Sequence, residues 1–302
     1  MAFESFYCSD LSRSASEKVF GSASIGEVWI LIEYPFGWGV KALDDSNLSA
    51  EIKAHLKQVI KTIPRSRVLF IKQDRVCRET VNLFVIRCRE REPFIVKFEL
   101  EDYRLLMEID FAEVAAGNLS SGGSITSEPL YLVCTHGRRD KCCAKFGFPL
   151  FKSLRREDEQ AVWQSSHVGG DRFAANLVCF PHGLFYAHVR EESGKEIMRE
   201  YKEGRIVNQK YRGRACYSHH VQAAEFFVRT ESGINLIDDL HRMDSARIDK
   251  ERWQVRFFER AKGSVHSVKV GRLMSNFQNF ITCHSTDVQR VPQFRLDGYE
   301  IA

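Results

Sequence analysis

The sequence lacks any long apolar run, and its opening segment, MAFESFYCSDLSRSASEKVF, has neither the basic nor the apolar region of a secretory signal. We therefore expect a cytoplasmic protein that does not bind membranes. A strong charge of one sign is also missing, because 44 Lys and Arg residues against 40 Asp and Glu residues leave a net charge of +4, spread along the chain. Nucleic-acid binding is therefore not expected.

The cysteines of this sequence do not suit a disulfide framework. Their number, nine, is odd, and in a cytosolic protein clustered cysteines are first interpreted as metal-binding or catalytic. No C-x-x-C motif occurs, and Cys134, Cys142 and Cys143 form the only cluster. The remaining cysteines are expected to be small core residues outside any site: Cys8, Cys77, Cys88, Cys179, Cys216 and Cys283.

Short strand-like and helical segments alternate along the chain, which predicts an α/β (α+β) fold. In the first part, apolar runs predict strands at 28–33, 67–72, 82–87 and 94–99, with a helix at 48–60. In the second part we expect a strand at 130–134, a helix from about Asp140, a strand at 161–164 and a hairpin formed by NLVCFP and LFYAHV. This β-α-β-β order matches half of a thioredoxin-like sheet.

A Gly/Ser-rich segment at 115–129 separates the two parts and predicts the main boundary. We expect an α/β unit at 1–120, a second unit at 121–210 and a helix and strand extension at 211–302. After the hairpin, helices are expected at 191–203 and 217–230, followed by strands at WQVRFFE, SVHSVKV and NFITC. The extension either completes the second sheet or forms a small α+β appendage.

The segment CTHGRRDKCC places Cys134 at the end of a buried strand and Cys143 nine positions later, after a polar loop. With Asp140 as N-cap, Cys142 and Cys143 fall in the first helical turn, where the helix dipole and the neighbouring basic residues favour thiolates. Pro149 either kinks this helix or delays its start, and in the second case the cysteines lie on a loop. On spacing alone, metal or redox use and a structural role are equally consistent.

In the segment WQSSHVGGDRFAAN, His167 and Asp171 are four positions apart, and the two glycines between them favour a loop that brings both side chains to one place. His136 is instead expected on the surface. Trp163 and Phe173 are expected to shield the site from water. Arg172 is expected to face an anionic centre or to pair with an acidic side chain.

Taken together, CTHGRRDKCCAKFGFPLFKSL and VWQSSHVGGDRFAANLVCFPHGLFYAHV resemble the two signature blocks of the sucrase/ferredoxin-like family. The resemblance is strongest from 130 to 190, extends weakly to VWILIEY and RVLFIK, and fades after about 205. Because this family is related to thioredoxin-like ferredoxins, the resemblance implies a thioredoxin-like ferredoxin domain at 121–210, preceded by a second α/β unit and followed by a small α+β tail.

The resemblance also implies a 2Fe-2S cluster bound by two cysteines and an H-x-x-x-H pair. Cys134 and Cys143 match the cysteines, His167 matches the first histidine, and Asp171 stands in place of the second. The fourth ligand is then Asp171, Cys142 or another side chain, or this branch binds no cluster; the retained spacing favours Asp171. Two thiolates, a histidine and a carboxylate give a net charge of about −1, which predicts a potential between roughly −400 mV and the Rieske range of about −150 to +300 mV.

The implied function is electron transfer or redox sensing, as an electron carrier rather than a stand-alone enzyme, with a reductase or electron acceptor as the partner protein. The sequence does not fix the oligomeric state. The first alternative is zinc held by the same four residues, with a structural or hydrolytic role. Thiol chemistry by Cys142 and Cys143 is disfavoured by the strain of a disulfide between neighbours. Sucrose hydrolysis needs two carboxylates about 5 to 9.5 Å apart, and no such pair stands out.

Overall fold

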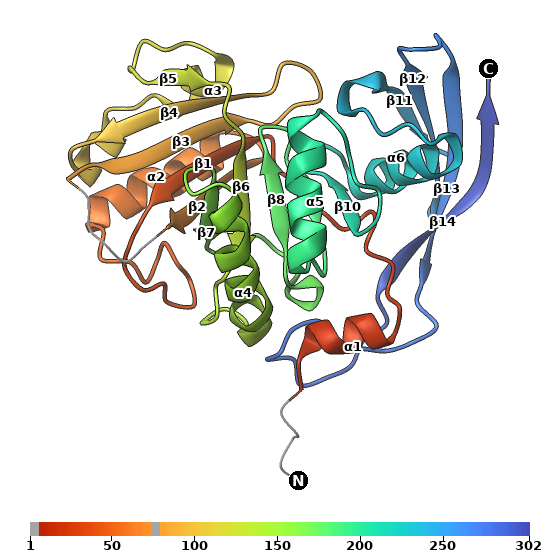
Figure 1. Cartoon of the computed structure of the whole chain (residues 1–302), viewed down its shortest axis with the longest axis horizontal. Coiled ribbons are helices and arrows are strands. Elements are labelled where there is room, and N and C mark those ends of the chain that lie inside the picture. Colours follow the sequence, from red (N-terminus) through yellow and green to blue (C-terminus); the bar gives the residue numbers. More distant parts are fainter. Residues whose placement is uncertain (1–5, 74–78) are drawn as a thin grey trace.

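The computed structural model describes residues 6–73 and 79–302, which form one large sheet, one small sheet and flanking helices (Figure 1). In spatial order the large sheet contains β10 (Tyr211–Arg214), β9 (Leu184–Tyr186), β8 (Leu177–Phe180), β6 (Leu130–Cys134), β7 (Val162–Ser165), β2 (Ser66–Lys72), β1 (Val28–Glu33), β3 (Val81–Arg87), β4 (Phe94–Leu100) and β5 (Ser124–Thr126). The small sheet contains β11 (Leu240–Arg247), β12 (Arg252–Glu259), β13 (Val265–Met274) and β14 (Pro292–Ile301). The α-helices are α1 (Cys8–Ser14), α2 (Ala50–Thr62), α3 (Phe111–Ala116), α4 (Lys141–Glu157), α5 (Glu191–Lys202) and α6 (His219–Ser232).

The large sheet consists of two halves with the same topology. In one half, β6 lies between β7, which is parallel to it, and β8, which is antiparallel to it, and β9 follows β8. In the other half, β1 lies in the same way between β2 and β3, and β4 follows β3. A helix, α4 or α2, connects each parallel pair. This is the thioredoxin-like strand order, and it confirms the predicted fold class.

The two halves are joined where β2 and β7 pair antiparallel at their carboxyl ends, Ile71 opposite Ser165 and Lys72 opposite Gln164. The carboxyl end of β7 therefore lies in the middle of the sheet. Loops of the N-terminal half can reach it there.

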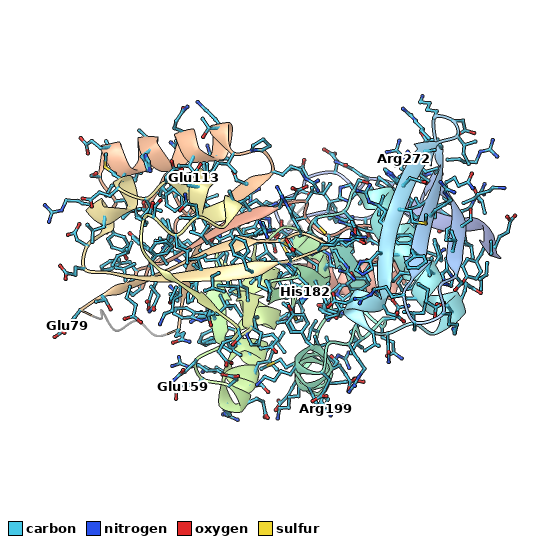
Figure 2. The ribbon with its side chains drawn as sticks, turned by 90° about the horizontal axis from the view of Figure 1, so that it is seen from above. Glu79, Glu113, Glu159, His182, Arg199 and Arg272 are labelled. Atoms are coloured by element: carbon cyan, nitrogen blue, oxygen red, sulfur yellow. The ribbon has the colours of Figure 1, made fainter. Side chains whose placement is uncertain are left out.

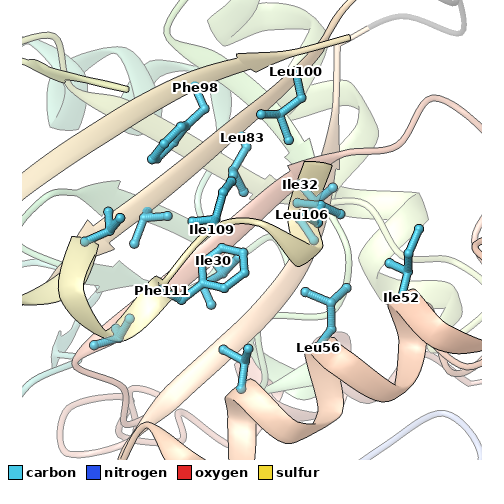
Figure 3. Close-up of a cluster of buried hydrophobic side chains, with 14 of the residues drawn as sticks. Ile30, Ile32, Ile52, Leu56, Leu83, Phe98, Leu100, Leu106, Ile109 and Phe111 are labelled. Atoms are coloured by element: carbon cyan, nitrogen blue, oxygen red, sulfur yellow. The ribbon is translucent and has the colours of Figure 1, made fainter. Parts of the chain in front are cut away.

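Helix α2 covers the N-terminal half of the sheet because its sequence is amphipathic. The helix begins at the N-cap Ser49, whose side chain accepts a hydrogen bond from the Ile52 amide. Its apolar face, with Ile52 and Leu56, packs on Ile30 and other strand residues of the same buried cluster (Figure 3). Among the described residues, no helix is both long enough and apolar enough to cross a membrane.

The C-terminal extension forms its own antiparallel sheet, β11–β14, which packs on α6, while β10 is added to the edge of the large sheet. Seen from above, the small sheet, marked by Arg272, lies at the opposite end of the molecule from the half marked by Glu79 and Glu113 (Figure 2). Each of the two predicted alternatives thus holds for a part of the extension, because β10 extends the large sheet and the rest forms the appendage. The strand predicted at NFITC is wrong, because that segment is a loop with one bridge, Asn279 to Gln289. The three-part division of the chain stays a prediction.

Candidate metal centre

Parallel pairing of β6 with β7 brings the first two predicted ligands together. Cys134 is the last residue of β6, lies opposite Ser165 of β7, and is almost fully buried. His167 follows two positions after Ser165, so it emerges at the same edge of the sheet. Side chains separated by 33 positions thereby meet through the strand pairing alone.

Helix α4 supplies the second sulfur. Its N-cap Asp140 accepts a hydrogen bond from the Cys142 amide at 2.9 Å, and the helix continues through Pro149 to Glu157. Cys143 therefore lies in the first helical turn and not on a loop. The helix packs tightly on the end of β6, because a Cβ at Gly147 would clash with the carbonyl oxygen of Cys134.

The candidate centre consists of two cysteine sulfurs and a histidine nitrogen, with the Asp171 carboxylate next to them. One donor atom each from Cys134, Cys143 and His167 lies within 4.8 Å of the other two. Asp171, buried in a one-turn helix, places Oδ1 at 3.5 Å from Cys143 Sγ and at 3.1 Å from His167 Nδ1. The 3.1 Å contact is an ion pair when the imidazole is protonated, although His167 Nδ1 makes no hydrogen bond of good geometry to any described residue.

The charges at this centre are coupled. The pKa of Cys134 is well below its usual range, mainly because the Cys143 thiol forms a hydrogen bond to it. His167 lowers this pKa further. The same contact with Cys134, together with burial, raises the pKa of Cys143. Burial alone would lower the pKa of His167, but Asp171 and Cys134 outweigh it and raise that pKa to about 9. The protonation of Cys134, Cys143 and His167 is therefore linked, because each group shifts the pKa of another.

His136 is a positioning residue that the sequence analysis placed wrongly on the surface. The loop at 37–39 covers it, and its exposed fraction is 2%. Its Nδ1 accepts a hydrogen bond of 3.2 Å from the His167 amide, and its Nε2 lies 2.6 Å from the Gly39 carbonyl oxygen. These two contacts require the tautomer with the proton on Nε2, and burial lowers the pKa of His136.

Arg212 of β10 is a second positioning residue, and nothing near it in the sequence indicated this. Its buried guanidinium donates hydrogen bonds to the Gly169 carbonyl oxygen at 3.0 Å and to Asn176 Oδ1 at 2.7 Å, on either side of Asp171. A Cβ at Gly170, which has a φ of 84°, would lie 2.6 Å from this guanidinium. Burial lowers the pKa of Arg212 to about 9, which still leaves a cation behind the centre.

The other predicted neighbours take ordinary structural places. Trp163 packs in the same apolar cluster as Cys134 and Cys143, and Phe173 is buried beside the Arg212 guanidinium. Arg172 pairs with the buried carboxylate of Glu17 at 2.7 Å, which is the second of its two predicted roles.

Cys142 points away from this centre, into a separate cluster with Cys8, Cys283 and Asp140. Consecutive positions on a helix are turned by about 100°, so Cys142 and Cys143 serve different groups. Cys8 is fully buried, as expected of a core residue, and Cys283 is half-buried; the two contact each other because their segments both pack on α4. Cys77, also predicted as a core residue, lies outside the described residues.

Cys134, Cys143 and His167 form a set of donors that could hold a metal, and Asp171 lies beside two of them. Two buried sulfurs and an imidazole nitrogen without a hydrogen-bond partner are the donors that 2Fe-2S clusters of mixed ligation use, and the set also suits zinc. A buried centre flanked by a cation stabilises a bound group of negative charge. The fold is that of a thioredoxin-like α/β protein, and at one strand end it gathers two cysteines and a histidine that could hold a metal.

Comparison with known proteins gives the family. The model described as sucrase/ferredoxin-like matches residues 19–213, and the chain belongs to this family. The chain is 38% identical over 104 residues to altered inheritance of mitochondria protein 32 of Meyerozyma guilliermondii, a match that covers 30% of this chain and 35% of that protein. A cysteine-to-serine variant of the thioredoxin-like [2Fe-2S] ferredoxin from Aquifex aeolicus matches at 18% identity and a TM-score of 0.25, over 28% of this chain and 97% of the ferredoxin.

Proposed function

We propose that this chain binds a 2Fe-2S cluster and functions as an electron carrier or redox sensor. The observation that supports this proposal is the convergence of two buried sulfurs and a nitrogen of the His167 imidazole within 4.8 Å, in a chain of the sucrase/ferredoxin-like family. When bound, the cluster supplies one-electron transfer at a potential set by its ligands and surroundings.

In this proposal the ligands are Cys134, Cys143, His167 and Asp171. Asp171 is preferred over Cys142 as the fourth, because its Oδ1 already lies next to Cys143 and His167 while Cys142 faces the other cluster. His136 holds the backbone of His167 in place, and Arg212 holds the loop on both sides of Asp171. The apolar cluster that contains Trp163 excludes water from the sulfurs.

A redox partner is expected to bind at a basic groove beside the centre. The groove, a cavity of about 1160 Å³, begins at Thr135 and His136 and continues along α4. Arg138, Lys152 and Arg156 are exposed in it. A partner with an acidic face fits this groove by charge, and opposite charges increase the rate of encounter.

The proposal is tested by anaerobic purification followed by iron, zinc and sulfide analysis and an absorption spectrum. We expect about two iron and two sulfide per chain and a red-brown protein. Iron below about 0.2 per chain after cluster reconstitution would contradict the proposal, and zinc at this centre with a colourless protein would favour the zinc alternative.

Replacing Asp171 by histidine is expected to raise the reduction potential of the reconstituted protein. The substitution removes one negative charge from the ligand set, and less negative centres accept electrons more readily, so a rise on the order of 100 mV is expected. Redox titration followed by electron paramagnetic resonance measures it. Asp158→His, at the far end of α4, is the control, and an unchanged potential in Asp171→His would show that the carboxylate is not a ligand.

A further inference from the structure

Three cysteines that are distant in the sequence meet at the first turn of α4. Cys8 comes from α1, Cys142 from α4, and Cys283 from the loop between β13 and β14. In Figure 1, α1 and this loop lie side by side below α4. The Sγ atoms are 3.6 Å apart for Cys8 and Cys142, 3.6 Å for Cys8 and Cys283, and 3.2 Å for Cys142 and Cys283.

The Asp140 carboxylate completes this group. Both of its oxygens lie 3.9 Å from Cys8 Sγ, and the four ligand atoms all lie within 4.8 Å of one another. Asp140 accepts hydrogen bonds from the Cys142 amide and, at 2.7 Å, from the Cys283 amide. A carboxylate has about four lone-pair positions, so two acceptor positions remain for a metal.

The distances fit a single tetrahedral ion. With zinc–sulfur bonds of about 2.3 Å and zinc–oxygen bonds of about 2.0 Å, tetrahedral ligand atoms lie roughly 3.5 to 3.8 Å apart. The three sulfur–sulfur distances and the distance from Cys8 Sγ to Asp140 Oδ1, 3.2 to 3.9 Å, surround this range, so small side-chain movements suffice for coordination. No disulfide joins any of these three cysteines.

Two backbone amides donate hydrogen bonds to sulfur atoms of this group. The Ser9 amide donates to Cys142 Sγ at 3.5 Å, and the Cys8 amide donates to Cys283 Sγ at 3.5 Å. Such backbone donors orient thiolate ligands and disperse their charge. Cys8, Cys142 and Asp140 are fully buried, while Cys283 is half-buried, which leaves an entrance for an ion.

We propose that Cys8, Cys142, Cys283 and Asp140 bind one zinc ion in a closed structural site. Binding converts the three thiols to thiolates, releases their protons to solvent, and leaves no ligand position for a substrate. The ion links α1 and the loop before β14 to the first turn of α4, which also contains Cys143. Residues 275 positions apart in the sequence are thereby tied together next to the candidate cluster centre.

This site is independent of the proposed cluster, because the two sets of ligands share no residue. A protein that fails to bind iron can therefore still bind this zinc, and the converse also holds. Its role is to stabilise the ends of the chain, since the binding free energy of a structural metal contributes to folding.

The test compares the zinc content of four purified proteins expressed with supplemented zinc: the unchanged chain, Cys283→Ser, Cys216→Ser and Cys134→Ser. Cys216 is half-buried like Cys283 but lies outside both clusters, so it is the matched control. We expect about one zinc per chain in the unchanged protein, in Cys216→Ser and in Cys134→Ser, and a drop of about fivefold or more in Cys283→Ser. Equal zinc in Cys283→Ser, or zinc below about 0.2 per chain in the unchanged protein, would overturn the proposal.

A second measurement uses only the unchanged chain, so it does not depend on the folding of a variant. Cobalt(II) exchanged into the site is expected to give the visible bands of a tetrahedral ion and the near-ultraviolet bands of cobalt–thiolate bonds. Alkylation mapped by mass spectrometry should show Cys8, Cys142 and Cys283 protected with the metal and modified after chelation. A Cys142–Cys283 disulfide in place of this protection would overturn the zinc site.

Discussion

Cys134→Ser is expected to reduce the iron and sulfide content of the purified protein by about tenfold or more. A serine hydroxyl stays protonated at neutral pH and is a poor ligand for iron compared with a thiolate. Cys134 also lies at the fixed end of β6, so no neighbouring thiol can take its place without moving the strand. Iron and sulfide analysis and the visible absorption spectrum measure the effect.

The matched control for this prediction is Cys179→Ser. Cys179 is fully buried in β8, which pairs with β6, and it lies outside both cysteine clusters. Both substitutions bury a hydroxyl, at a cost of about 1 to 3 kcal/mol when it finds no partner. Loss of iron in both variants would indicate general destabilisation, whereas equal iron in Cys134→Ser and the unchanged chain would remove Cys134 from the ligand set.

The parts of the centre that sequence analysis located correctly are those fixed by local structure. The apolar run LYLVC defines β6, and Asp140 caps the next helix, so Cys134 and Cys143 could be placed at a strand end and in a first helical turn. The glycines before Asp171 indicated a loop, and the structure has one, with a short helical turn at Asp171–Phe173. These features depend on residues only a few positions away, so a local sequence pattern can predict them.

The parts that were missed depend on contacts between distant segments. His136 looked like a surface residue because its loop is polar, but Gly39 of the N-terminal half covers it. Cys8 and Cys283 looked isolated because 275 positions separate them. Strands β11 and β14 were missed because their half-exposed, charged sequences pair only within the small sheet. No local periodicity contains this information.

The pairing of the two halves of the sheet explains how residues of the N-terminal half contact the candidate centre. Because β2 and β7 pair only near their carboxyl ends, the loops that follow β1 come close to the residues that follow β7. Gly39 then accepts the hydrogen bond that fixes the His136 tautomer. Ser24 donates a hydrogen bond of 2.6 Å to the Val168 carbonyl oxygen, directly after His167. The N-terminal half therefore contacts the centre and helps to orient His136 and the backbone next to His167.

Glu225→Gln is expected to destabilise the protein by about 3 to 5 kcal/mol. Glu225 of α6 is fully buried, and its Oε1 lies 2.9 Å from Arg214 and 3.0 Å from Arg229, whose side chains are also buried. Its other oxygen accepts a hydrogen bond of 2.9 Å from the Tyr211 hydroxyl. Removing the charge leaves two buried guanidinium groups without their counter-ion, which is far more costly than losing an exposed pair. Urea denaturation at neutral pH measures the loss, and Glu231→Gln, exposed on the same helix, should change stability by less than about 0.5 kcal/mol.

The pH dependence of this effect has a defined sign. Burial alone would raise the pKa of Glu225, but Arg214 and Arg229 outweigh it, and the pKa in the folded protein is lowered. A carboxyl group with a lowered pKa stabilises the folded state above its unfolded pKa, about 4.3, and this stabilisation is lost as the pH falls through the folded value. The difference between the unchanged chain and Glu225→Gln should therefore be full at pH 7 and shrink only below about pH 4. A difference that shrinks between pH 7 and 5 would contradict a charged Glu225, and would shift the explanation to packing between α6 and β10.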